Sequence, residues 1–202
     1  MKIYLVRHGQ SRWQVERDEN NWDSPLTDLG EQQAQYLAKW LANQPLIDKS
    51  GTQVNIQSIH ASPLLRAQQT AVCLAQALQL PLVTDSYLRE TDFLVSDHLA
   101  SASAPAHYPP TTAPTSTYVT FKAQAQHALS NLVAVSENSS GSVLAVAHGG
   151  LISTMLRLAA GSDTVSFWIY NATLNLIEWK RGRWHFVYLN LWDHLPTHLR
   201  TY

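Results

Sequence analysis

Near its start the chain reads Ile3-Tyr4-Leu5-Val6-Arg7-His8-Gly9, and in its second half it reads Val143-Leu144-Ala145-Val146-Ala147-His148-Gly149. Each segment is a short apolar run that ends in His-Gly. Such runs are typical of strands that are buried on both faces of a parallel sheet. Ligands of open parallel sheets bind beyond the carboxyl ends of the strands. We therefore expect His8 and His148 to meet at one functional site at that edge of the sheet.

The rest of the chain alternates between strand-like and helix-like patterns. Apolar residues at helical spacing follow Thr27, a typical N-cap, and a strand-like run covers 54–60. Ser62-Pro63 is expected to open a second helix, because proline is favoured at the first helical position, and a short strand-like run follows at 82–84. Two β-rich runs, 174–179 and 184–191, flank Gly182 and predict a hairpin. This order predicts a three-layer α/β/α fold with a mostly parallel central sheet and a C-terminal hairpin.

One segment in the middle departs from this alternation. In the twenty residues of 98–117, sixteen are Ala, Ser, Thr or Pro, and the four prolines disfavour a long helix or a central strand. A disordered linker between domains would have this composition, but helical spacing of apolar residues resumes at Tyr118. We therefore expect a single domain over 1–202, with a surface excursion at 95–117. Long loops of compact domains are often lids, so the excursion is a candidate lid.

Two arginines lie close to the expected site. Arg7 directly precedes His8, and Arg66 follows the strand-like run 54–60 near the start of the next helix. An arginine there does not complement the helix dipole, whereas an anion bound between the helix N-terminus and the guanidinium would explain it. Arginine binds phosphate through two parallel hydrogen bonds, and a neutral imidazole can attack phosphorus. The pattern therefore predicts a phosphoryl-transfer site, which needs mainly positioning and charge neutralisation.

The order of the short motifs along the chain resembles the histidine phosphatase superfamily, also called the phosphoglycerate mutase-like family. The matching motifs include Arg7-His8-Gly9, Ser24-Pro25-Leu26-Thr27, Ser62-Pro63-Leu64-Leu65-Arg66-Ala67, Leu88-Arg89-Glu90 and Ala147-His148-Gly149-Gly150. Asn171-Ala172-Thr173 and the closing segment from Leu189-Asn190 to His194-Leu195 also resemble the family. Matches run from about residue 3 to about residue 195, interrupted by the excursion. The resemblance implies a phosphoglycerate mutase-like fold, and an enzyme that uses no metal and no organic cofactor.

The resemblance also implies a role for each matching residue. His8 resembles the nucleophile that forms a phosphohistidine intermediate. Arg7, Arg66 and His148 resemble the phosphate pocket, where they stabilise charge on the transferring oxygens. Glu90 resembles the group that protonates the leaving oxygen and later activates water.

Two positions depart from the family pattern. Family members usually carry glycine shortly after the acid, whereas Glu90 is followed by Thr91-Asp92-Phe93, so Asp92 stays an alternative to Glu90 as the acid. Gln14 stands where the family commonly has a pocket asparagine, and we expect its longer amide to donate to a phosphate oxygen. Trp13 and Trp22 are the two tryptophans that we consider as pocket walls.

Several classes of protein and site are disfavoured. Fourteen Lys and Arg oppose fifteen Asp and Glu, so no basic surface for nucleic acid is expected. The first apolar run is too short for a signal peptide, and no run reaches the roughly 18 apolar residues of a membrane span. With its single cysteine, Cys73, the chain is expected to be cytoplasmic, without a membrane partner. His194 and His198 have the spacing of a metal pair but no carboxylate or thiol partner, so we expect them to be surface or tail residues.

These observations favour a phosphatase that hydrolyses small phosphomonoesters through a phosphohistidine on His8. The alternatives are a phosphoglycerate mutase, a phosphatase of phosphohistidine proteins, and a catalytically silent phospho-ligand binder. From 91 to 156 the chain has one Lys or Arg, Lys122. A substrate whose leaving group has little negative charge is therefore expected, which argues against the mutase. The sequence makes no prediction of the oligomeric state.

Overall fold

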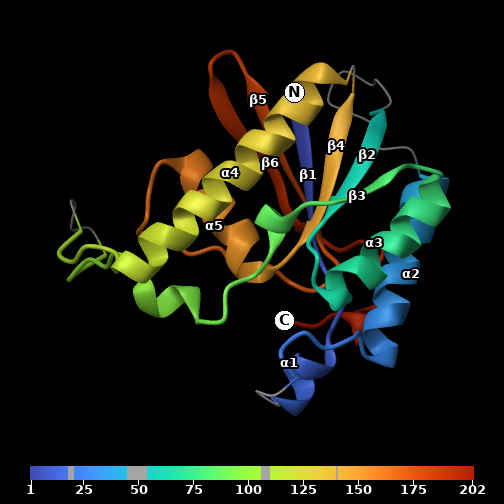
Figure 1. Ribbon diagram of the computed structural model, residues 1–202, viewed down its shortest axis with the longest axis horizontal. Coiled ribbons are helices and arrows are strands. Elements are labelled where there is room, and N and C mark those ends of the chain that lie inside the picture. The colour runs from blue at the N-terminus through green and yellow to red at the C-terminus, as the bar shows by residue number, and fades with distance from the viewer. Residues whose placement is uncertain (18–20, 45–53, 106–109, 140) are drawn as a thin grey trace.

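A mixed sheet of six strands forms the centre of the computed structural model, which describes residues 1–17, 21–44, 54–105, 110–139 and 141–202 (Figure 1). The strands are β1 (Lys2–Arg7), β2 (Ile56–Ala61), β3 (Leu82–Thr84), β4 (Ser142–Ala147), β5 (Leu174–Lys180) and β6 (Arg183–Leu191). Their order in the sheet is β3-β2-β4-β1-β5-β6. The first four strands of that order are parallel, and the hairpin β5–β6 joins β1 in antiparallel pairing. The predicted sheet is therefore confirmed.

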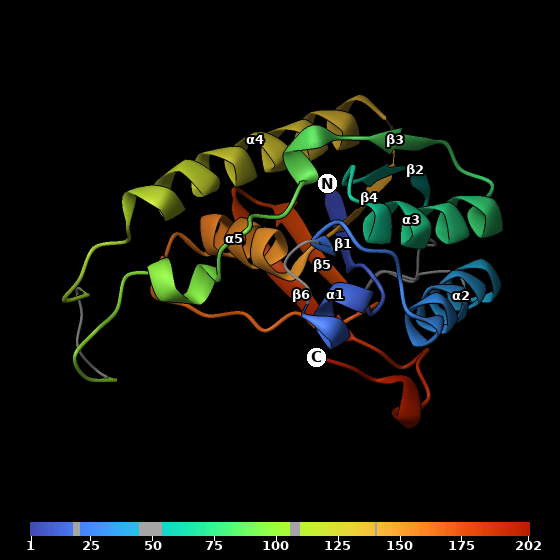
Figure 2. The same cartoon turned by 60° about the horizontal axis from the view of Figure 1, so that its bottom comes forward.

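Helices cover both faces of the sheet. They are α1 (Arg12–Glu16), α2 (Asp28–Asn43), α3 (Leu65–Leu78), α4 (Ser116–Asn138) and α5 (Gly149–Ala160), with short 3₁₀ helices η2 (Ser86–Leu88), η3 (Val95–His98) and η4 (Thr197–Leu199). In Figures 1 and 2, α2 and α3 lie on one face, and α4 and α5 lie on the other. The predicted three-layer arrangement is confirmed. None of the described helices has both the length and the apolar character that a membrane crossing needs.

The two central strands, β1 and β4, carry unbroken apolar runs, at 3–6 and 143–147, because both of their faces are covered. Along β1, Ile3 and Leu5 pack in the cluster that includes α4 and α5, whereas Tyr4 and Val6 pack in the cluster that includes α2 and α3. All four side chains are at most 1% exposed. Successive side chains of a strand point to opposite faces, so a strand between two helical layers needs apolar residues throughout.

The parallel register brings the ends of three strands to one edge of the sheet. Arg7 lies beside Ala147, and the backbone N–H of His8 donates to the carbonyl of Ala147 at 3.0 Å. The N–H of Ser62, directly after β2, donates to the carbonyl of Val146, also at 3.0 Å. The residues that follow β1, β2 and β4 are thus fixed relative to one another by backbone hydrogen bonds.

The predicted start of one helix is confirmed and that of another is wrong. Thr27 is the N-cap of α2, and its hydroxyl accepts a hydrogen bond from the N–H of Gly30. The helix expected to open at Pro63 begins two residues later, at Leu65. The physical reason is a serine turn: the hydroxyl of Ser62 accepts from the N–H of Leu64, which leaves the intervening proline before the helix.

The excursion at 95–117 is closed at its base and extends away from the sheet. Thr115, the N-cap of α4, donates its N–H to the carbonyl of His98, and its hydroxyl lies 2.9 Å from Nδ1 of the same histidine. Figures 1 and 2 show the described outer part beyond the N-terminal end of α4, far from the carboxyl ends of β1 and β4. Val95 is buried and is packed close to Gly150. Pro109 lies outside the described residues, and the role of the excursion as a lid stays a prediction.

Candidate active site

His8 directly follows β1 and is buried, with 4% of the residue exposed. Its Nδ1 is 2.6 Å from the carbonyl oxygen of Gly9, and its Nε2 is 3.2 Å from Nε of Arg66. A carbonyl only accepts and a guanidinium only donates, so Nδ1 carries the proton and Nε2 carries the lone pair. Burial, with the charges of Arg66 and Arg7, lowers the pKa of His8 well below 6.5. A neutral imidazole with Nε2 as its free base is the form that can act as a nucleophile.

Arg66 is buried, with 3% of the residue exposed, and its guanidinium has three neighbours. Besides its contact with His8, its Nη1 donates to the carbonyl of Trp22 at 2.8 Å, and its guanidinium carbon lies 5.2 Å from the centroid of the Trp22 ring. Arg89 approaches the same ring at 5.4 Å. The expectation of Trp22 beside the pocket agrees with this geometry, whereas the ring of Trp13 contacts Arg17.

Arg7 presents an unpaired donor next to His8. Its Nη1 donates to the carbonyl of Ile169, and its Nε is buried without a hydrogen-bond partner among the described residues. Burial lowers the pKa of Arg7 to about 10, against the raising effect of Glu90, so the guanidinium is charged at neutral pH. A buried unpaired donor is unfavourable, and in a native protein it calls for a functional reason.

His148 faces His8 from the neighbouring strand end. The two ring centroids are 5.0 Å apart, at an interplanar angle of 59°. Nε2 of His148 is 2.7 Å from the hydroxyl of Ser62, whereas Nδ1 is buried without a partner in the described part of the chain. Burial lowers the pKa of His148 well below 6.5, and His8, Arg66 and Arg7 lower it further. The ring is therefore neutral and offers Nδ1 to a ligand.

Arg7, His8, Arg66 and His148 form the cluster around His8, and Glu90 is the carboxyl group that lies with it. Its Oε2 accepts the backbone N–H of Gly150 at 2.8 Å, and its Oε1 accepts the N–H of Thr91 at 3.2 Å. Burial raises the pKa of Glu90, although these bonds and the charges of Arg7 and Arg66 oppose that shift. Asp92 is exposed, and within the described ranges no hydrogen bond connects its side chain to the cluster. The geometry thus favours Glu90 over Asp92 as the acid.

Together these groups can hold a tetrahedral anion in front of Nε2 of His8. Arg7 and Arg66 supply two positive charges. The donor Arg7 Nε and the ring nitrogen His148 Nδ1 both lack a partner among the described residues. A phosphoryl group has oxygens to satisfy such donors, and donors fixed in advance stabilise charge that develops during transfer. A carboxyl group whose pKa is raised is suited to protonate the leaving oxygen.

The structure places Gln14 beside this cluster rather than pointing its amide at the charged groups. Nε2 of Gln14 donates to Oδ1 of Asn171 at 3.1 Å and approaches the carbonyl of Tyr202 at 3.4 Å. The amide of Asn171 in turn donates to the carbonyl of His8 at 3.0 Å. Gln14 therefore supports the backbone of His8 through Asn171, and its role as a phosphate ligand stays a prediction.

Several contacts of the site could not be found by reasoning from the sequence. Ser62 and Asn171 stand within motifs that match the family, but nothing in their local pattern shows which atom they contact. His194 lies in the C-terminal tail after β6, but the expectation that it is a surface residue is wrong. It is 6% exposed, its Nε2 lies 2.9 Å from the carbonyl of Ala172, and its ring is 5.6 Å from that of Trp40. A histidine in a tail can be buried when the tail packs back on the domain, as here.

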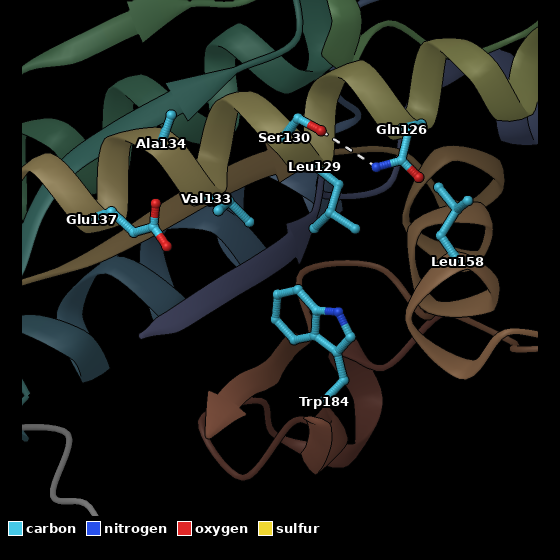
Figure 3. A pocket seen from close by; sticks show the side chains of 8 residues that line it. All are labelled: Gln126, Leu129, Ser130, Val133, Ala134, Glu137, Leu158 and Trp184. Carbon is cyan, nitrogen blue, oxygen red and sulfur yellow. Dashed lines mark hydrogen bonds between the residues drawn. The ribbon is translucent and has the colours of Figure 1, made fainter. Parts of the chain in front are cut away.

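A second hollow among the described residues has no histidine or arginine in its lining. A cavity of about 400 Å³ lies between α4, α5 and β6, where the side chains of Leu129 and Trp184 face one another and Glu137 is the charged member of the lining (Figure 3). In the described residues, no group of three or more His, Cys, Asp or Glu side chains is placed to hold a metal ion. The cluster around His8 is therefore the candidate active site.

Comparison with known proteins gives one match to a family and several to individual proteins. The family is described as the histidine phosphatase superfamily (branch 1), and its model matches residues 3–191. A protein of Yersinia pestis named "Probable phosphoglycerate mutase GpmB" is 38% identical over 99 residues. That match covers 48% of this chain and 41% of the relative, so the chain spans less than half of that relative's length.

Solved structures match over nearly the whole chain. YhfR of Bacillus stearothermophilus has a TM-score of 0.69 and 26% sequence identity, over 96% of this chain and 98% of that chain. A phosphoserine phosphatase of Entamoeba histolytica has the same TM-score at 19% identity, over 96% of this chain and 99% of that chain, and this likeness shows the fold alone. The family match covers the strands, the helices and the cluster around His8. The chain therefore belongs to the histidine phosphatase superfamily, branch 1.

Proposed function

We propose that this protein is a phosphatase that hydrolyses small phosphomonoesters through a phosphohistidine on Nε2 of His8. The observation that carries the proposal is the fixed tautomer of His8. The Gly9 carbonyl and the Arg66 guanidinium leave the lone pair on Nε2. The same site holds Arg7 Nε and His148 Nδ1, which have no partner among the described residues. This arrangement fits a nucleophile together with the donors that stabilise the group it attacks.

The reaction proceeds in two steps. In the first, the lone pair of His8 Nε2 forms a bond to phosphorus while the bond from phosphorus to the ester oxygen breaks, and protonated Glu90 gives its proton to that oxygen. In the second, water attacks phosphorus, the Glu90 carboxylate takes a proton from it, and the bond between phosphorus and Nε2 breaks. Phosphate leaves, His8 regains its lone pair, and Glu90 is again protonated.

The test combines turnover with trapping of the intermediate. The protein is incubated with 4-nitrophenyl phosphate and with a panel of phosphorylated metabolites, and parallel samples carrying labelled phosphate are quenched in alkali, in which phosphohistidine survives. We expect turnover and label on the wild-type protein, and neither with His8→Ala. Absence of turnover with His8 intact would overturn the proposal, as would full activity of His8→Ala.

A phosphoglycerate mutase is the second candidate, because of the partial match to a relative of that name. A mutase must bind a second anionic group of its substrate. Lys122, the one cation of 91–156, lies 2.6 Å from Asp163 and is therefore already paired. The labelled phosphoenzyme separates the candidates: a mutase passes its label to phosphoglycerate, whereas a phosphatase passes it to water.

A further inference from the structure

The hydroxyl of Ser62 is the hydrogen-bond partner of His148 on the side of the ring remote from the unpaired Nδ1. Its oxygen is 2.7 Å from Nε2 of His148, and both residues are fully buried. Ser62 directly follows β2 and His148 directly follows β4. The bond from the Ser62 N–H to the Val146 carbonyl, between the same two strands, fixes their distance. The contact is thus built by the sheet, not by a flexible loop.

The direction of this hydrogen bond follows from the other partner of the serine. The backbone N–H of Leu64 points at the Ser62 oxygen at 3.3 Å, so the oxygen already accepts one hydrogen bond. Nε2 of His148 is the acceptor available to the hydroxyl proton, and the described residues provide no second one. If Nε2 carried the proton instead, the hydroxyl proton would be buried without an acceptor, which is unfavourable.

We propose that Ser62 is a positioning residue that fixes His148 in the tautomer with its proton on Nδ1, so that the ring donates this proton in a hydrogen bond to the phosphoryl group. Nδ1 is buried without a partner among the described residues, and the His8 ring centroid is 5.0 Å from that of His148. With the proton on Nε2, the lone pair of Nδ1 would face an anion and repel it. The identity of the acceptor rests on the proposed phosphatase function, whereas the tautomer does not.

Burial has a second consequence for this arrangement. The pKa of His148 is lowered, first by burial and then by His8, Arg66 and Arg7, so the ring is not protonated on both nitrogens at neutral pH. A ring protonated on both nitrogens would donate from Nδ1 whatever group Nε2 contacts. A neutral ring donates from Nδ1 only in one of its two tautomers, so the partner of Nε2 decides whether the donor exists.

The direct test is the tautomer of His148 in the full chain, read by long-range ¹H–¹⁵N NMR and assigned by the signal lost in His148→Asn. We expect the Nδ1–H tautomer in the wild-type protein and a shift toward Nε2–H in Ser62→Ala. Ser136→Ala is the matched control, because it also removes a buried hydroxyl, here one that donates to the Gly141 carbonyl. An Nε2–H tautomer in the wild-type protein overturns the proposal even if no variant folds, and so does a folded Ser62→Ala with an unchanged tautomer. This measurement needs no substrate, so its failure is separate from a failure of the phosphatase assay.

Kinetics give the second readout. We expect Ser62→Ala to lower kcat by about 10- to 100-fold, as for metal-site histidines that lose their orienting partner. Ser62→Thr keeps the hydroxyl and should restore both the tautomer and most of the rate. A variant that loses stability but keeps the wild-type kcat and tautomer would assign Ser62 a structural role only and overturn the proposal.

Discussion

Nε of Arg66 donates a hydrogen bond across 3.2 Å to Nε2 of His8. In the proposed reaction, this Nε2 is the atom that forms the bond to phosphorus. Once that bond forms, Nε2 has no lone pair left to accept with. The N–H of Arg66 Nε must then donate to a different acceptor, an oxygen of the bound phosphoryl group. Nη1 of Arg66 also donates to the Trp22 carbonyl, so the planar guanidinium has a second fixed contact besides His8.

The first prediction concerns the two donors of the Arg66 guanidinium, Nε and Nη1. Arg66→Lys replaces a planar group that reaches both His8 and Trp22 by a single ammonium group that cannot hold both. We expect kcat/KM for 4-nitrophenyl phosphate to fall by about 10²- to 10³-fold, the usual effect of removing one preorganised donor. Arg12→Lys, at an exposed position of α1, is the control and should retain wild-type activity. Equal activities of the two variants would contradict the role of Arg66.

The fold could be predicted from the sequence because its signals are local. Strands buried on both faces, such as β1 and β4, need apolar residues on both faces, and both carry unbroken apolar runs. Thr27 carries the side chain that caps α2. The strand ends could be predicted to meet because parallel strands share one edge. The position of His8 and His148 at equivalent strand ends therefore indicated the site before any contact was known.

The contacts that complete the site could not be predicted in the same way. The bond between Ser62 and His148 joins residues 86 positions apart, and that between Asn171 and His8 joins residues 163 positions apart. Each depends on the register of strands and on the path of a loop, which no local pattern records. The resemblance to the family predicted Gln14 as a phosphate ligand, whereas in the structure its amide donates a hydrogen bond to Asn171.

The second prediction separates two neighbouring glycines. A Cβ on Gly150 would lie 2.7 Å from Oε1 of Glu90 and 3.0 Å from Oε2, so Gly150→Ala must displace the carboxyl group. A Cβ on Gly149 would have its nearest neighbour, Nε of Arg7, at 3.6 Å, which is ordinary contact. We expect Gly150→Ala to lower kcat for alkyl phosphates by about 10- to 100-fold, part of the usual effect of general acid catalysis. Gly149→Ala should stay near wild type, and a loss of activity in that variant alone would refute the argument.

The third prediction distinguishes Glu90 from Asp92 by the leaving group. Glu90→Gln removes the proton donor, so we expect the rate on alkyl phosphates to fall by about 10²- to 10⁴-fold. In the first step, measured as the rate of leaving-group release in a single turnover, the loss on 4-nitrophenyl phosphate should be smaller, because nitrophenolate leaves without a proton. Since burial raises the pKa of Glu90, its acid form persists to higher pH, and the alkaline limb of kcat should disappear in the variant.

Asp92→Asn is the matched control for this prediction, because its carboxyl group is exposed. It should keep both the rates and the alkaline limb of the wild-type protein. If Asp92→Asn instead shows the dependence on leaving group, the acid is Asp92 and the assignment to Glu90 is wrong.

The fourth prediction concerns the stability of the fold in acid. Burial lowers the pKa of His194 to about 4, from 6.5 for an ordinary histidine. Between these pH values the unfolded chain binds a proton that the native protein does not bind. The free energy of unfolding therefore falls as the pH is lowered through this interval, by at most about 1.4 kcal/mol per pH unit for one such group.

His194→Gln removes this titration, and the amide N–H of glutamine can still donate to the Ala172 carbonyl. We expect the free energy of unfolding, measured by urea denaturation between pH 6.5 and 4, to fall less steeply in the variant than in the wild-type protein. The buried His8 and His148 contribute with the same sign in both proteins, so they do not alter the difference. His198→Gln, at an exposed position, should leave the slope unchanged. If both variants show the wild-type slope, protonation of His194 is not coupled to unfolding, and its burial in the native fold does not restrict its charge.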